Sequence, residues 1–174
     1  MSYKAPVKDM MFNIQHLAGL ESLTQIEAFA DAGLDTAQAV LEECAKFNEN
    51  VVAPTNWSAD VAPSYWEAGN KVVTSKGFKE AYKQYCAGGW QSLQHPPEYG
   101  GQGLPKTIGS VCGEILNAAN TSFALCPMLT DGCTEVIATS DVGPRILRRV
   151  GLVERDVHAD AVDDQRCRGT GGDH

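Results

Sequence analysis

The spacing of apolar residues is the feature that most constrains the fold of this chain. In residues 5–17 they recur at steps of three and four, which predicts an amphipathic helix. Residues 34–54 carry a longer stripe of the same kind, and we expect Pro54 to end that helix. Further stretches with helical spacing are residues 20–33, 75–90 and 106–140. Strand alternation of convincing length is absent from the sequence. It therefore predicts an all-α fold, a helical bundle of about five or six helices with an irregular C-terminal tail.

Two stretches depart from a simple amphipathic pattern. Residues 55–75 keep no sustained period and are rich in Asn, Ser, Pro and Gly, which predicts a loop of about twenty residues. We expect its aromatic side chains to anchor this loop by packing. Residues 106–140 are expected to form two helical segments, the second starting near Thr121 or Ser122. Because apolar residues lie on more than one face of that second segment, we expect it to be deeply buried.

Composition and charge exclude several classes of protein. The chain has 174 residues and a formal net charge of -8, so we expect no nucleic-acid partner. Without a run of eighteen apolar residues, no membrane span is predicted. None of the six cysteines forms a C-x-x-C pair, and the opening MSYKAPVKDMMF does not resemble a secretory signal. We therefore expect a cytoplasmic protein with free thiols, of which Cys44, Cys112 and Cys126 are buried.

The stretch HPPEYGGQGLP, residues 95–105, packs three prolines and three glycines between two predicted helices. One hypothesis is a phosphate-binding loop, but the residues after its last glycine fit neither common glycine-rich phosphate motif, and no strand precedes it. The other hypothesis is a tight corner. It expects positive φ at Gly100 and Gly101, close backbone approach at Gly103, and Pro105 in the first turn of the next helix.

The segments PEYGGQGLP, GEILNAANTSFALCPMLTDG and YKAPVKDMMF together point to a known family. In this order they resemble the N-terminal helical domain of acyl-CoA dehydrogenases, in the subgroup that includes the 3-methylmercaptopropionyl-CoA dehydrogenases. The resemblance covers about residues 3–140. It implies an N-terminal helical domain over residues 1–140, followed by an atypical tail over residues 141–174.

Membership of this family implies α,β-dehydrogenation of an acyl-CoA thioester by an FAD-dependent oxidoreductase that is expected to form a homo-oligomer. The sequence contains no T-E-P-x-A-G-S-D flavin segment and no acid where the family has its catalytic base. We therefore assign no catalytic residue. We expect the chain alone to be an inactive, truncated fragment that does not hold FAD.

The resemblance also implies a substrate-binding stretch within residues 123–132, which match the family segment at the floor of the acyl pocket. By that correspondence the acyl tail would be lined by Phe123, Ala124, Pro127, Met128 and Thr130. The alternative is that these residues are simply part of the core, as apolar helix residues usually are.

The tail, residues 141–174, departs from the family pattern. It places six arginines in 34 residues and keeps no long apolar period. This composition predicts a disordered tail or one translated in a shifted frame. His158, Cys167 and His174 match no zinc-binding spacing, so no metal site is predicted.

Two other classes of function stay open at this point. One is a stand-alone helical interaction module without flavin, which would have no exposed apolar face. A dehydrogenase domain separated from its partner domains would instead expose an apolar patch. The other is a nucleotide-phosphate binder that uses the glycine-rich stretch.

Overall fold

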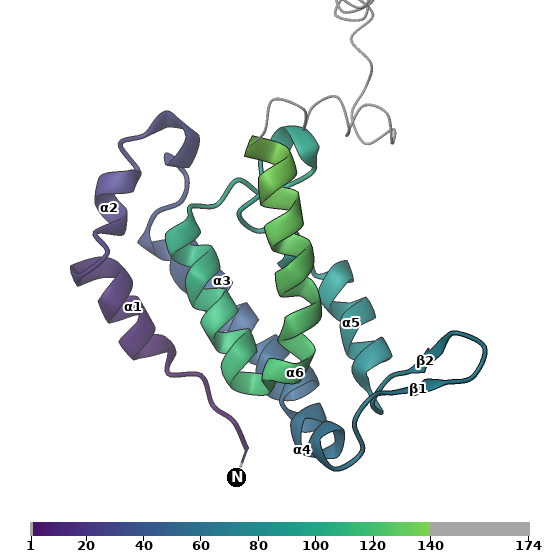
Figure 1. Cartoon of the computed structure of the whole chain (residues 1–174). Coiled ribbons are helices and arrows are strands. Elements are labelled where there is room, and N and C mark those ends of the chain that lie inside the picture. The colour runs from purple at the N-terminus through teal and green to yellow at the C-terminus, as the bar shows by residue number, and fades with distance from the viewer. Residues whose placement is uncertain (1, 140–174) are drawn as a thin grey trace, which may run out of the picture. The chain divides into compact units, whose positions relative to one another are not determined.

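The computed structural model describes residues 2–139, and in this range the chain is mostly helical, as predicted (Figure 1). The α-helices are α1 (Val7–His16), α2 (Leu20–Leu23), α3 (Leu34–Phe47), α4 (Pro54–Val61), α5 (Phe78–Ala87) and α6 (Lys106–Thr139). A π-helical segment, Asn48–Val52, joins α3 to α4, and short 3₁₀ turns occupy Glu27–Phe29, Trp90–Ser92 and Pro97–Tyr99. The predicted tail, with His158, Cys167 and His174, lies outside the described residues.

By its internal contacts the chain divides into two units, Met1–Cys133 and Thr134–His174. The first unit holds α1 to α5 and most of α6. In the second unit the described residues, 134–139, are the final residues of α6.

The prediction for residues 54–75 is wrong in two respects. Pro54 does not end a helix but begins α4. Proline is tolerated there because it has no N–H group, and an N–H group in the first turn of a helix has no acceptor within that helix. The rest of the stretch contains a short antiparallel hairpin of β1 (Tyr65–Glu67) and β2 (Lys71–Val73). Gly69 and Asn70 both have positive φ, 88° and 59°, and so form the turn between the strands. The hairpin is too short for strand alternation to show in the sequence.

The aromatic side chains of this region do not anchor it. Trp57 is 77% exposed, and Tyr65 and Trp66 are both more than half exposed. The expectation that they pack is therefore wrong.

Two clusters of buried side chains form the core of the first unit. The first joins α1, α2, α3 and the first half of α6 through Met10, Ile14, Leu20, Leu41, Cys44, Ile108 and Ile115. The second joins the π-helical segment, α5 and the middle of α6 through Val52, Ala81, Tyr85, Leu116, Ala119 and Phe123. The amphipathic stripes seen in the sequence are therefore the buried faces of these helices. α6 contributes to both clusters.

α6 consists of two helical segments, as predicted, with a break at Asn120. This residue has extended backbone, with φ −163° and ψ 97°, and the chain changes direction there (Figure 1). Its side-chain Oδ1 accepts a hydrogen bond of 3.1 Å from the N–H of Phe123 and so caps the second segment. Its Nδ2 donates to Oγ1 of Thr55 at 3.0 Å, which ties the break to α4.

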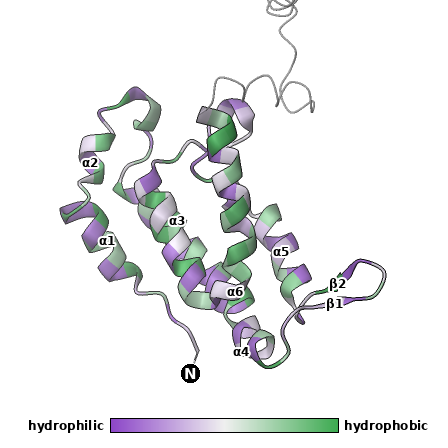
Figure 2. Cartoon of the chain, in the orientation of Figure 1, coloured by the Kyte–Doolittle hydropathy of each residue, from purple (hydrophilic) through white to green (hydrophobic). Residues whose placement is uncertain are grey.

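The second half of α6 is not deeply buried, contrary to expectation. Leu125, Met128 and Leu129 are 50%, 52% and 68% exposed, and they follow the spacing of a single helix face. Figure 2 shows hydrophobic residues along this part of α6. Apolar residues on several faces indicated burial, but only one of those faces is covered within the first unit.

The glycine-rich stretch forms a tight corner before α6. Gly100 and Gly103 have positive φ of 83° and 66°. Gly101 has no positive φ, but a Cβ there would lie 2.0 Å from the carbonyl oxygen of His95, so only glycine fits. Pro105 is fully buried at the start of α6. The hypothesis of a corner is therefore correct, but two of its reasons are exchanged. Gly101 is required by close approach to backbone and not by positive φ, whereas Gly103 has positive φ and lies near the side chain of Pro97 rather than near backbone.

The extended N-terminal segment is held by Glu49 of the π-helical segment. Its carboxylate pairs with the ammonium group of Lys4 and accepts a hydrogen bond of 3.0 Å from the N–H of Ala5. The hydrogen bond from Lys4, followed by that from Ala5, lowers the pKa of Glu49.

A group whose pKa is lowered in the folded state stabilises the fold above its unfolded pKa, which is about 4.3 for Glu. We expect wild type to be more stable than Glu49→Gln at pH 7. We expect this difference to shrink as the pH falls below about 4. Urea unfolding of both proteins from pH 7 to pH 3 measures it. Glu43→Gln is the control, because the Glu43–Lys46 pair is exposed and should contribute little at any pH. A Glu49→Gln protein that matches wild type at every pH would contradict the prediction.

Candidate functional site

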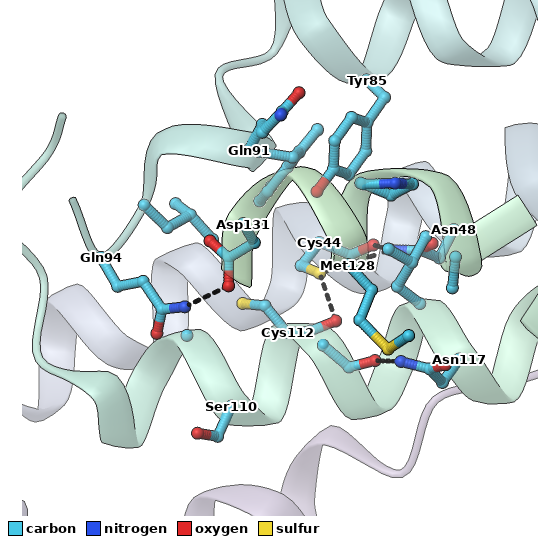
Figure 3. A pocket seen from close by; sticks show the side chains of 17 residues that line it. Cys44, Asn48, Tyr85, Gln91, Gln94, Ser110, Cys112, Asn117, Met128 and Asp131 are labelled. Carbon is cyan, nitrogen blue, oxygen red and sulfur yellow. Dashed lines mark hydrogen bonds between the residues drawn. The ribbon is translucent and has the colours of Figure 1, made fainter. Parts of the chain in front are cut away.

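A cavity of about 230 Å³ lies among α3, α5, the Trp90–Ser92 turn and both segments of α6 (Figure 3). Cys44 of α3 and Asn48, the first residue of the π-helical segment, form one side, and Tyr85 comes from α5. The first segment of α6 contributes residues from Gly109 to Asn117, and the second contributes four residues from Ala124 to Asp131. The break at Asn120 brings the two segments of one helix to the same cavity.

Three of the five predicted substrate-binding residues line this cavity. They are Ala124, Pro127 and Met128. Phe123 does not line it: it is 3% exposed and packs edge-to-face against Phe78 in the second core cluster, with ring centroids 5.5 Å apart. Thr130 is exposed, and its hydroxyl donates to the backbone carbonyl of Cys126. That these residues contact an acyl tail stays a prediction.

Sequence reasoning missed a polar group at the edge of the cavity. Asp131 accepts a hydrogen bond of 3.1 Å from Nε2 of Gln94, and its other oxygen lies 2.8 Å from Nε2 of His95. Gln94 and Asp131 line the cavity, and His95 begins the glycine-rich corner. No sequence spacing could indicate this group, because it forms only after the chain turns at Asn120.

Two thiols line the wall of the cavity, from Cys44 and Cys112. Sγ of Cys44 lies 3.8 Å from the carbonyl oxygen of Cys112. Hydrogen bonding to Cys112, together with burial, raises the pKa of the Cys44 thiol far above its ordinary value. The thiol therefore stays protonated and is a poor nucleophile. Cys126, expected to be buried, is exposed, because it lies on the uncovered side of α6.

Asn48 is the most deeply buried amide of the cavity, at 2% exposure. Its Nδ2 donates to the carbonyl oxygen of Cys44 at 2.8 Å. Its Oδ1 has no hydrogen-bond partner. Tyr85 and Trp90 supply the aromatic part of the cavity wall. Burial raises the pKa of Tyr85, so its hydroxyl stays neutral. Nothing in the sequence marked Asn48 as different from other asparagines.

The glycine-rich corner does not have the geometry of a phosphate site. The backbone N–H groups of residues 99–104 all donate to backbone carbonyls of residues 92–97. A phosphate cradle needs several N–H groups that point at the ligand. This corner therefore does not fit the phosphates of FAD or of another nucleotide. Within residues 2–139, no three metal-ligating side chains come together, and no helix is long and apolar enough to cross a membrane.

Comparisons with known proteins identify the class. Over 138 residues the chain is 42% identical to a 3-methylmercaptopropionyl-CoA dehydrogenase of Ruegeria pomeroyi, which covers 79% of this chain. Over 119 residues, 68% of this chain, it is 25% identical to the broad-specificity linear acyl-CoA dehydrogenase FadE5 of Mycobacterium tuberculosis. No family model matches the chain. The chain belongs to the acyl-CoA dehydrogenase family, and it spans 23% and 20% of the lengths of these two relatives.

Proposed function

We propose that this chain forms a helical part of an FAD-dependent acyl-CoA dehydrogenase and that its cavity receives the acyl chain of the substrate. Family membership supports the class of reaction, α,β-dehydrogenation of an acyl-CoA thioester. The observation that carries the proposal for the cavity is its lining. Ala124, Pro127 and Met128 face it, and the resemblance assigned these same residues to the acyl tail.

The chemical step is not assigned to any residue of this chain. The cavity wall offers two neutral groups, the Cys44 thiol and the Tyr85 hydroxyl, which are poor bases at neutral pH. Its one carboxylate, that of Asp131, is already paired with Gln94 and His95. FAD is the cofactor expected in the whole enzyme. We expect this chain alone not to hold it, because the N–H groups of the glycine-rich corner are already paired. The role proposed for these helices is to bind and orient the acyl chain and to exclude water from it.

The apolar face of α6 formed by Leu125, Met128 and Leu129 supports a role within a larger assembly. A stand-alone module was expected to have no exposed apolar face. We propose that this face contacts other parts of the dehydrogenase, in the same or a neighbouring subunit of a homo-oligomer. Binding of a hydrophobic dye to the purified chain tests whether the face is exposed. We expect the dye to bind, and to bind less when Leu125 and Leu129 are changed to Gln.

Hexanoyl-CoA and free CoA test the acyl site in the chain itself. We expect hexanoyl-CoA to bind more tightly than CoA, measured by titration calorimetry, because only the former has an apolar chain to bury. Met128→Trp places a larger side chain at the cavity and should weaken hexanoyl-CoA binding about tenfold or more. Leu129→Trp is the matched control, since this neighbour is exposed and does not line the cavity. Equal binding of the two ligands, or equal effects of the two variants, would contradict the proposed site.

A further inference from the structure

Two thiols that do not line the cavity, those of Cys86 in α5 and Cys126 in the second segment of α6, lie beside the same side chain. The hydroxyl of Tyr82 interacts with both of them. It also donates a hydrogen bond of 3.4 Å to Oε1 of Gln91. Burial, followed by the interactions with the two thiols, raises the pKa of Tyr82. A single hydroxyl that interacts with both thiols indicates that they are neighbours, although 40 residues separate them in the sequence.

The aromatic contacts between the two helices place both cysteines at the same level. Figure 1 shows α5 and the second segment of α6 side by side and running in the same direction. The ring centroid of Phe123 lies 5.5 Å from that of Phe78 and 6.3 Å from that of Tyr82. One helical turn further on, Cys86 follows Tyr82 by four residues and Cys126 follows Phe123 by three. Residues at these spacings share a helix face, so each cysteine continues the contact of the turn before it.

Two helices in contact leave a span that a disulfide can bridge. The axes of packed helices are about 8–10 Å apart, and each Cα atom lies about 2.3 Å from its axis. Cα atoms on the facing sides are therefore roughly 3–6 Å apart. A disulfide usually joins Cα atoms that are about 4.4–6.8 Å apart. These ranges overlap, and the overlap lies toward the edge of the contact, where exposed side chains such as Cys86 and Cys126 are found.

Access to solvent separates this pair of thiols from the other pair in the fold. Cys44 and Cys112 are buried, so an oxidant dissolved in water does not reach them. Cys86 and Cys126 are both exposed. Cys133 is exposed as well, but it lies seven residues beyond Cys126, about two helical turns along α6. Within residues 2–139, Cys86 and Cys126 are therefore the exposed thiols that share a contact.

We propose that Cys86 and Cys126 form a reversible redox site, which glutathione disulfide oxidises to a disulfide between α5 and the second segment of α6. One cysteine thiol attacks glutathione disulfide, so that a mixed disulfide forms and one glutathione leaves as a thiol. The other thiol attacks the cysteine sulfur of the mixed disulfide and releases the second glutathione. The protein gives up two electrons and two protons, and the two glutathione molecules take them up.

This site goes beyond the proposed function and does not depend on it. Tyr85 and Pro127, the sequence neighbours of the two cysteines, line the cavity. The disulfide would therefore hold two walls of the cavity, α5 and the second segment of α6, at a fixed distance.

Mass spectrometry tests the proposal on the full chain, equilibrated with reduced and oxidised glutathione at neutral pH and then alkylated. We expect a cross-link between the tryptic peptides 84–106 and 107–145, which contain the two cysteines. It should exceed the glutathione adducts of these cysteines at least about tenfold, because the second attack is intramolecular. Cys126→Ser should remove the cross-link and leave Cys86 as a glutathione adduct. Cys133→Ser is the matched control and should keep the cross-link.

Thermal unfolding is the second measurement. Oxidation should raise the midpoint of wild type and of Cys133→Ser by about 5 °C or more, because the cross-link restricts the unfolded chain. Cys126→Ser should show no such rise. Three results would overturn the proposal: glutathione on each of the two cysteines without a cross-link, thiols that stay unmodified, or a cross-link that survives Cys126→Ser and is lost in Cys133→Ser.

Discussion

Gly101→Ala is expected to destabilise the folded chain by about 3 kcal/mol, at the upper end of the cost of overpacking. A Cβ at this position would lie 2.0 Å from the carbonyl oxygen of His95 and 2.3 Å from its carbon. These are backbone atoms, so a rotation of one side chain cannot relieve the clash. The same carbonyl accepts a hydrogen bond of 3.0 Å from the N–H of Gly103, which the shift would break. Chemical denaturation of wild type and variant measures the loss.

The matched control for this prediction is Gly113→Ala. Gly113 lies inside the first segment of α6, and a Cβ there would meet nothing within 4 Å. Alanine is a better helix former than glycine, so this change should stabilise the chain by about 0.5–1 kcal/mol. If Gly101→Ala were as stable as wild type, the close approach at the corner would be wrong.

The second large effect is expected for Asn120→Ala, which should lower the free energy of unfolding by about 2–3 kcal/mol. Alanine removes the cap on the N–H of Phe123 and the hydrogen bond to the buried hydroxyl of Thr55. The hydroxyl keeps only its own donation to the carbonyl oxygen of Val52 at 2.7 Å. Both losses occur where the two segments of α6 meet, so the cavity between them should also be disturbed.

A double-mutant cycle isolates the contact between Asn120 and Thr55. We expect Thr55→Val alone to lower the free energy of unfolding by about 1 kcal/mol. The double variant should lose about 1 kcal/mol less than the sum of the losses of the two single variants. Asn117→Ala, at an exposed helical position nearby, should change stability by less than about 0.5 kcal/mol. Strict additivity of the Asn120 and Thr55 changes would contradict the role of the hydrogen bond between them.

The helices and the corner were predictable because their causes are local. Apolar spacing marks the buried faces of α1, α3 and α5, since each helix turns the same side to the core about every 3.6 residues. The proline and glycine residues before α6 act through their own backbone preferences. The break in α6 was also visible, because Asn120 precedes Thr and Ser residues that favour helix starts.

The parts that were missed depend on partners distant in sequence or on ambiguous signals. Pro54 is equally compatible with the end and with the beginning of a helix, and the π-helical segment before it decided the outcome. The group of Asp131, Gln94 and His95 and the unpaired oxygen of Asn48 exist only in the folded chain. The exposed apolar face of α6 was misjudged because periodicity shows that a face is apolar, not what covers it.

The π-helical segment makes the length of the chain between α3 and α4 as important as its composition. In this segment the N–H of Ala53 bonds to the carbonyl oxygen of Asn48, five residues back, so the turn holds one residue more than an α-helical turn. Deleting one residue here would rotate everything after it by about 100° around the helix axis. Thr55 would then face away from Asn120. Gains or losses of single residues at this point should therefore be far less tolerated than substitutions at its exposed position, Asn50.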